Sequence, residues 1–184
     1  ERLQNCPSKF PRITYDQAIE ELQMMGEDLK WGDDISSKRE QMLIERYGSV
    51  PLFITHYPDP MVDFGEETEV EKFFNMLPDP NWHGRVQSSD LILPMAGESV
   101  GSAARVHNVE EMIARLEGSK MFARLKKRGG DLSDFEWYIK QLRTKGSVPH
   151  AGCGFGMARI LQWIQGENDI RNSVTFVQNK ERLI

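Results

Sequence analysis

The sequence predicts an α+β fold in which an antiparallel sheet is flanked by helices. Two strand-like segments, Arg85–Leu93 and Glu98–His107, are separated by only a short turn, which is typical of a hairpin. Helical patterns lie before and after these strands and do not alternate with them, which argues against a doubly wound parallel sheet. The chain has 184 residues, enough for one domain with a buried core.

The first part of the chain predicts two helices and a strand. Pro7 and Pro11 disfavour helix in residues 1–13, which we expect to be extended. The elements that follow are a helix from a capping box at Thr14–Gln17 to Gly26, a helix from Ser36 or Ser37 to Gly48, and a buried strand at Pro51–Tyr57.

Residues 58–81 predict a long loop. Prolines punctuate it at both ends, and only Val70–Met76 indicates a short helical or extended piece. Loops of this length inside a compact domain are usually functional lids or disordered insertions. We interpret this loop as a mobile insertion.

The remaining elements complete the sheet. The hairpin turn is expected at Pro94–Gly97. It is followed by a helix from Asn108 to the basic run 126–128, a helix at Phe135–Arg143 capped by Ser133, a glycine-containing strand, and a last helix that ends at Gly166. The basic run complements the negative end of its helix, and we interpret it as a solvated helix end and not as an RNA site.

The composition limits the class of protein. The formal net charge is −5, which argues against binding of nucleic acid through bulk electrostatics but leaves room for a local basic groove. The two cysteines, Cys6 and Cys153, form no metal-binding motif and fit a reducing compartment. No apolar run is long enough to span a membrane. We therefore expect no membrane partner and a cytoplasmic location, with the mitochondrial matrix as the alternative.

A glycine-rich strand is the first candidate for a binding site. Gly152, Gly154 and Gly156 alternate, and Arg159 follows within one helical turn. Bare backbone can press flat against a ligand, and the arginine would place a fixed positive charge beside it, a combination that suits a nucleotide. The alternative is that the glycines only allow close helix packing and that the arginine pairs with a nearby carboxylate.

Two carboxylates form the second candidate. Asp90 and Glu98 lie on either side of the hairpin turn, so the paired strands bring them close together. Mg²⁺ bound with nucleotide phosphates would relieve their repulsion. Arg105 comes seven residues after Glu98, so the two share a face only if the strand contains a bulge, which we expect at Gly101. The alternative is an exposed turn acid and a surface arginine.

Several segments together resemble the catalytic domain of class II aminoacyl-tRNA synthetases, in the aspartate, asparagine and lysine group. The segments are PLFITHYP, SSDLILPMAGESVGSAAR, WY followed by LRTKGSVPHAGCGFGMAR, and WIQGENDIRNSVTF. Within that group they most resemble the asparaginyl-tRNA synthetases. Residues 1–184 correspond to the C-terminal part of that domain, with the loop insertion at 58–81.

The resemblance implies a role for each candidate residue. Gly152, Gly154, Gly156 and Arg159 match the third class II motif, which binds ATP and includes the catalytic arginine. Asp90 and Glu98 match the ligands of Mg²⁺, and Glu98 also contacts ATP. Arg105 and His150 match positions that bind the amino acid. The implied substrates are asparagine or aspartate, ATP and tRNA, and the implied protein is a homodimer formed through a motif that these residues lack.

The same comparison shows departures from the family pattern. Ala158 replaces an acid, Ser102 replaces a glycine, Ala103 replaces a serine, and Glu71 stands where a lysine is expected, with Lys72 beside it. The first two motifs and the anticodon-binding barrel have no counterpart here, so we expect these 184 residues alone to be inactive. Two alternatives to an aminoacyl-tRNA ligase remain: a non-catalytic binding or regulatory paralogue, and an amino-acid ligase that works without tRNA.

Overall fold

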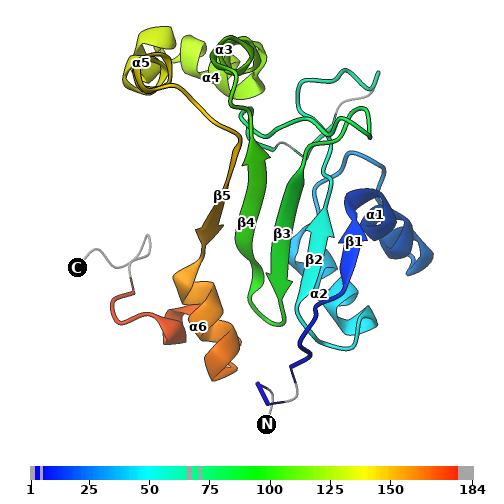
Figure 1. The fold of residues 1–184 in the computed structure, drawn as a ribbon. Helices are drawn as coiled ribbons and strands as arrows, with labels where there is room; N and C mark the ends of the chain where they lie inside the picture. Colours follow the sequence, from blue (N-terminus) through cyan, green and yellow to red (C-terminus); the bar gives the residue numbers. More distant parts are fainter. Residues whose placement is uncertain (1–2, 5, 66–67, 71, 178–184) are drawn as a thin grey trace.

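The computed structural model describes residues 3–4, 6–65, 68–70 and 72–177 and contains a five-stranded sheet. Its strands lie in chain order (Figure 1): β1 (Arg12–Thr14), β2 (Leu52–Thr55), β3 (Ser88–Leu93), β4 (Gly97–Arg105) and β5 (His150–Phe155). The predicted antiparallel pairing is confirmed from β2 to β5. The extended first segment, however, ends in a strand that pairs parallel to β2, because two helices cross over between them.

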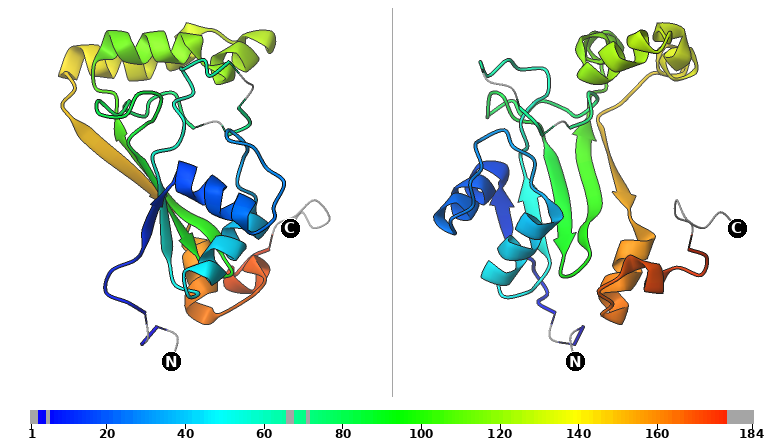
Figure 2. Two further views of the ribbon diagram at one scale, coloured as in Figure 1. Left: turned by 90° about the vertical axis from the view of Figure 1, so that its right-hand side faces the viewer. Right: turned by 180° about the vertical axis from the view of Figure 1, so that it is seen from behind.

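Helices α1 (Tyr15–Met24) and α2 (Ser37–Arg46) cover one face of β1 to β3 (Figure 2). The predicted capping box is confirmed: the Thr14 hydroxyl accepts from the Gln17 amide, and the Gln17 side chain accepts from the Thr14 amide. These helices bury the larger core against the sheet. Its largest fully buried side chains are those of Tyr15, Leu22, Leu43, Ile44, Leu52, Ile54 and Ile92.

A helical lobe stands at one end of the sheet (Figure 1). It consists of α3 (Val109–Gly118), α4 (Lys120–Lys127), the 3-10 helix η1 (Leu132–Phe135) and α5 (Glu136–Lys145). A second hydrophobic core fills the lobe, and the side chain of Phe74 belongs to it. The lobe therefore packs on the 58–81 loop as well as on itself.

Two predictions about the lobe are wrong. The single helix expected from Asn108 is broken at Ser119, whose backbone is extended and whose hydroxyl caps α4 by accepting from the Phe122 amide. Ser133 does not cap the helix expected at Phe135–Arg143: it lies within η1, which Asp131 caps in a capping box with Asp134, and α5 follows with no side-chain cap. In both cases a local side chain binds backbone amides that the helical periodicity does not reveal.

The described residues of the 58–81 loop pack against the folded domain. They form isolated bridges and turns but no helix, so Val70 and residues 72–76 are irregular, and Glu71 lies outside the described residues. Val70 and Phe74 are buried. Arg115 of α3 binds the carboxylate of Asp59 through two hydrogen bonds, at 2.8 and 3.1 Å, and donates to the Phe74 carbonyl at 2.7 Å. These contacts hold the described residues of the loop, called the lid below, against the helical lobe; its interpretation as a mobile insertion stays a prediction.

The chain continues from β5 into α6 (Met157–Gln165) and then the 3-10 helix η2 (Ile170–Ser173). Helix α6 ends at Gly166 as predicted, in the left-handed conformation that glycine favours. Among the described residues, no helix has the length and apolar character needed to cross a membrane.

The buried pair of Asp59 and Arg115 generates a stability prediction. The substitution Asp59→Ala leaves a buried guanidinium without its counter-charge and should lower the free energy of unfolding by about 3–5 kcal/mol. The substitution Glu110→Ala breaks an exposed ion pair with Arg143 in the same lobe and should cost at most about 1 kcal/mol. Urea unfolding measures both, and equal losses would contradict the prediction.

Candidate functional site

The register of the sheet places the predicted site residues on one face. Asp90 pairs with Gly101, which pairs with Gly154, and further along β4 Arg105 pairs with His150. Alternate residues of a strand point to the same side, so Asp90, Arg105 and the alternating glycines share a face. This is the face that α1 and α2 cover over β1 to β3; beyond the contact of α2 with the Glu98 end of β4, they leave β4 and β5 uncovered (Figure 2).

A bulge turns Glu98 to the same face, but not where the sequence predicts it. Leu91 pairs with Val100 and Ile92 pairs with Glu98, which leaves Ser99 as the extra residue. The prediction that the bulge lies at Gly101 is therefore wrong: it lies two positions earlier, at Ser99. Ser99 is fixed by its surroundings, because its carbonyl accepts from the Gly156 amide at 2.8 Å and its hydroxyl donates to the Gly97 carbonyl at 2.9 Å.

Asp90 and Glu98 converge over the bare backbone of Gly101. A Cβ at position 101 would lie 3.2 Å from Glu98 Oε1 and 3.6 Å from Asp90 Oδ1. Burial, followed by the negative charge of Asp90, raises the pKa of Glu98. The pair thus favours a cation. Among the described residues, no group of three or more His, Cys, Asp or Glu side chains is arranged to hold a metal ion by itself. Mg²⁺ commonly takes one or two carboxylates and completes its shell with phosphates and water.

Lys72 belongs to the site, although the family pattern places its lysine at the neighbouring position, Glu71. Its ammonium lies 2.5 Å from Asp90 Oδ2 and 3.9 Å from the centre of the Tyr57 ring. Tyr57 is buried, which raises the pKa of its hydroxyl well above the ordinary value. Glu71, which stands where the family pattern has a lysine, lies outside the described residues. The loop thus brings a lysine to the carboxylates from the adjacent position.

The surroundings of the three glycines of the motif differ, so the missing side chain has a different consequence at each position. A Cβ at Gly152 would lie 3.3 Å from Nε of Arg105, and one at Gly156 would lie 3.2 Å from the carbonyl oxygen of Ser99. A Cβ at Gly154 would meet no atom within 4 Å. Gly156 therefore serves packing, Gly152 lies under the arginine, and Gly154 presents open backbone next to Gly101.

Arg105 and His150 lie at the opposite end of the site from the carboxylates. The Arg105 guanidinium donates to the Asn75 side chain of the lid at 2.7 Å. His150 is exposed, and its Nδ1 lies 2.7 Å from the Val148 carbonyl oxygen. Arg105 is four positions after Gly101, so the two ends are about 13 Å apart along β4.

Arg159 and a residue that the sequence did not indicate, Glu40, meet at the carboxylate end. Arg159 lies in the first turn of α6 and donates to the Ala96 carbonyl in the hairpin turn. Glu40 is a buried residue of α2, and its Oε2 accepts from the Glu98 amide at 3.2 Å. Burial raises the pKa of Glu40 to about 7. Glu40 lies in the first turn of α2, where acids are common, so the sequence gives no specific signal for this role.

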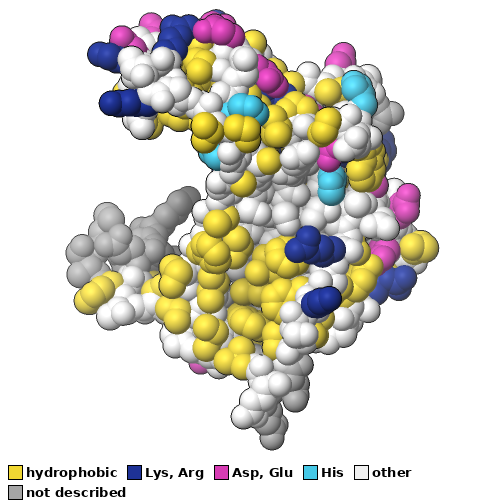
Figure 3. Space-filling view, in the orientation of Figure 1, with side chains coloured by type: hydrophobic (Ala, Val, Ile, Leu, Met, Phe, Trp, Pro, Cys, Tyr) yellow, Lys and Arg dark blue, Asp and Glu magenta, His cyan; other side chains and the backbone are white. Residues whose placement is uncertain are grey.

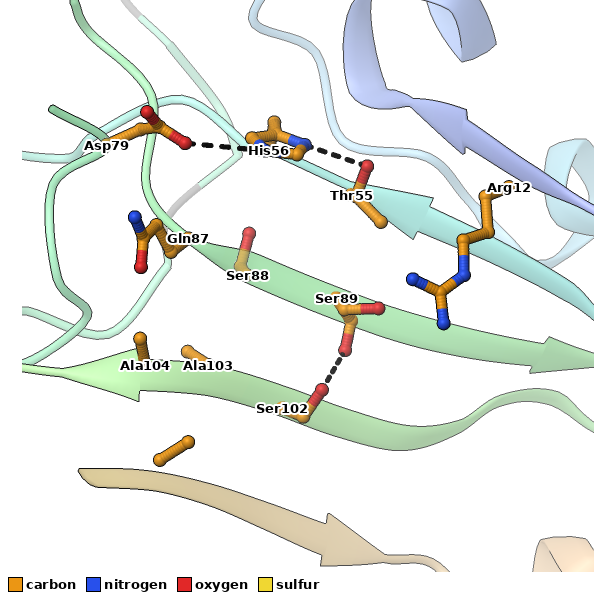
Figure 4. Close-up of a pocket in the computed structure, with 11 residues that line it drawn as sticks. Arg12, Thr55, His56, Asp79, Gln87, Ser88, Ser89, Ser102, Ala103 and Ala104 are labelled. Atoms are coloured by element: carbon orange, nitrogen blue, oxygen red, sulfur yellow. Dashed lines mark hydrogen bonds and ion pairs between the residues drawn. The ribbon is translucent and has the colours of Figure 1, made fainter. Parts of the chain in front are cut away.

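Ser102 does not line this site. Its hydroxyl donates to the Ser89 carbonyl at 2.6 Å and borders a cavity of about 390 Å³ on the other face of the sheet (Figure 4). The interpretation that Ser102 lines the same pocket as the candidate site residues is therefore wrong, because Ser102 alternates with Gly101 along β4 and faces the other side of the sheet. Hydrophobic side chains gather over the strands on that other face (Figure 3). Ala158, in contrast, directly precedes Arg159 at the start of α6.

Comparison with known proteins identifies similar chains over nearly the whole length. Residues 1–180 match the family model of class II tRNA synthetases (D, K and N). Asparagine–tRNA ligase of Pyrococcus abyssi is 34% identical over 182 residues, and that of Pyrococcus horikoshii is 35% identical. Each alignment covers 98% of this chain and 37% of the relative, so the chain spans about 37% of the length of these curated relatives.

Solved structures agree with the sequence relatives. Asparaginyl-tRNA synthetase from Pyrococcus horikoshii, complexed with asparaginyl-adenylate, superposes with a TM-score of 0.79 at 34% identity, over 98% of this chain and 37% of that one. Aspartyl-tRNA synthetase from Entamoeba histolytica gives a TM-score of 0.74 at 27% identity, over 96% of this chain and 33% of that one.

The contact between Lys72 and Asp90 generates a prediction for the ligand-free protein. The substitution Lys72→Met leaves the buried Asp90 carboxylate beside Glu98 without its cation and should lower the free energy of unfolding by about 3 kcal/mol. Added Mg²⁺ should restore part of the loss, because it binds only the folded site. Lys38→Met, which removes an exposed pair with Glu27, is the control. A Mg²⁺ effect of equal size in both variants would contradict the prediction.

Proposed function

This chain belongs to the class II aminoacyl-tRNA synthetases of the aspartate, lysine and asparagine family, and we propose on this basis that the protein is an asparagine–tRNA ligase. It would activate asparagine with ATP to an aminoacyl-adenylate and transfer the acyl group to tRNA. The observation that carries the proposal is the arrangement along β4, with Glu98, Asp90 and Arg159 at one end and Arg105 at the other.

The carboxylate end is proposed to bind ATP. Arg159 would hold the phosphates from the first turn of α6, where the positive end of the helix dipole favours anions. The open backbone of Gly154 would support the nucleotide, since a Cβ there would meet no protein atom within 4 Å. Mg²⁺ held by Asp90 and Glu98 would offset the charge of the phosphates.

The other end is proposed to bind asparagine. Arg105 is held by a neutral partner, Asn75, so its charge remains available for a substrate oxygen, and His150 lies beside it on β5. The distance of about 13 Å between the two ends allows an extended aminoacyl-adenylate to lie along β4.

The proposed chemistry needs no covalent bond to the protein. The α-carboxylate of asparagine, already ionised, attacks the α-phosphorus; the new P–O bond forms as the bond to pyrophosphate breaks. The ribose hydroxyl of the tRNA end then attacks the acyl carbon and releases AMP. The residues of this chain would contribute by orienting the two substrates and by stabilising charge on the phosphates.

The proposed macromolecular partners are tRNA and a second copy of the protein. The two cysteines are free, which agrees with the reducing cytoplasm as the proposed location. The substitution at Ser102 no longer favours the alternative of a non-catalytic paralogue, because its hydroxyl lies on the other face of the sheet. Ala158 is the remaining described substitution in its favour.

The direct test is asparagine-dependent exchange between pyrophosphate and ATP, catalysed by the complete gene product. We expect exchange with asparagine well above the rates with aspartate and lysine. Absence of exchange with all three amino acids, in a preparation that is folded, would refute the assignment as a ligase.

A substitution at Gly154 tests the proposed nucleotide surface. Gly154→Val should leave the unfolding temperature nearly unchanged, because the position is open, yet weaken ATP binding at least about tenfold by occupying the ligand's place. Cys153→Val is the matched control: the neighbouring exposed residue of β5 points to the other face and should leave ATP affinity unchanged. Calorimetry with ATP and Mg²⁺ measures both, and equal affinities in the two variants would contradict the proposal.

A further inference from the structure

The turn between β3 and β4 is held by polar side chains of two helices. Its backbone is unusual, since Met95 and Gly97 both have positive φ, at 66° and 70°. From α2, the Gln41 side chain accepts from the Met95 amide at 2.8 Å. From α6, the Gln162 side chain donates to the Met95 carbonyl at 3.1 Å, and Arg159 donates to the carbonyl of Ala96. The strained turn is thus fixed from both sides immediately before Glu98.

Glu40 differs from the other charged residues of α2. Lys38, Arg39 and Arg46 pair with glutamates of α1 and the loop that follows it. Glu40 instead is buried against the hairpin and accepts the Glu98 amide at 3.2 Å. A buried carboxylate costs free energy unless hydrogen bonds or an opposite charge offset the loss of water. Stability alone does not explain an acid here.

The opposite charge near Glu40 is Arg159, across Gly97. A Cβ at position 97 would lie 2.7 Å from Glu40 Oε2 and 3.3 Å from Arg159 Nη1. The two side chains therefore reach the same residue, one from α2 and one from α6. Only glycine leaves room for both, and only glycine adopts this backbone conformation without strain.

We propose that Glu40 is a positioning residue for the phosphate end of the site. It holds the backbone amide of Glu98, and its charge orients the guanidinium of Arg159, so that the two groups keep a fixed spacing. Glu40 itself would contact neither ATP nor asparagine. The inference rests on the proposed function in so far as Glu98 and Arg159 bind ATP with Mg²⁺.

The test compares Glu40→Ala and Glu40→Gln with a control in the complete gene product. The control, Leu43→Ala, removes a fully buried side chain of the main core from the next turn of the same helix and lowers the urea midpoint. Calorimetry gives the affinity for ATP with Mg²⁺, and exchange kinetics give separate KM values for ATP and asparagine.

We expect Glu40→Ala to weaken ATP binding and raise KM for ATP at least tenfold, with KM for asparagine changed less than twofold. Glu40→Gln keeps an acceptor for the Glu98 amide but loses the charge, and should weaken ATP binding about threefold. Leu43→Ala should bind ATP like the wild type.

Three results would overturn the inference: folded Glu40 variants with wild-type ATP affinity, equal loss of ATP affinity in Leu43→Ala, and a wild-type protein that binds no ATP. A wild-type protein that binds ATP but catalyses no exchange would refute the proposed ligase activity alone. In that case, weaker ATP binding by the Glu40 variants would still support the positioning role.

Discussion

The extra residue at Ser99 decides which face of the sheet Glu98 belongs to. In a regular strand Glu98 and Arg105 would lie on opposite faces, because their positions differ by seven, an odd number. The bulge reverses this and brings Glu98 over Gly101 beside Asp90. The bulge in turn depends on Gly156, whose amide binds the Ser99 carbonyl and whose missing side chain lets α6 approach. One irregular residue therefore couples the carboxylates of the hairpin to the arginine of α6.

The electrostatics of the site follow from this convergence. Asp90, Glu98 and Glu40 gather where burial makes negative charge costly, as the raised pKa values of Glu98 and Glu40 indicate. Lys72 and Arg159 offset part of this cost from two different segments, the lid and α6. The lid is itself anchored on the helical lobe through Asp59 and Arg115. The position of Lys72 is thus linked to the second core, far away along the chain.

The parts of the fold that depend on neighbouring residues could be predicted from the sequence. The capping box at Thr14, the hairpin around Pro94–Gly97 and the stop at Gly166 are examples, since each depends on residues within a few positions. The bulge position and the approach of Glu40 could not, because each depends on contacts between segments distant in the chain. The break at Ser119 has a local cause, a hydroxyl that caps α4, but a periodic pattern of apolar residues carries no information about it.

The order of groups along β4 is the central claim, and a crystal structure of the complete protein with a non-hydrolysable asparaginyl-adenylate analogue tests it most directly. We predict that the analogue lies along β4, with its adenylate part at the end of the site that holds Gly154 and Arg159 and its side-chain amide at Arg105. An analogue bound in the cavity beside Ser102, or bound without contact to Arg105 and Arg159, would contradict it.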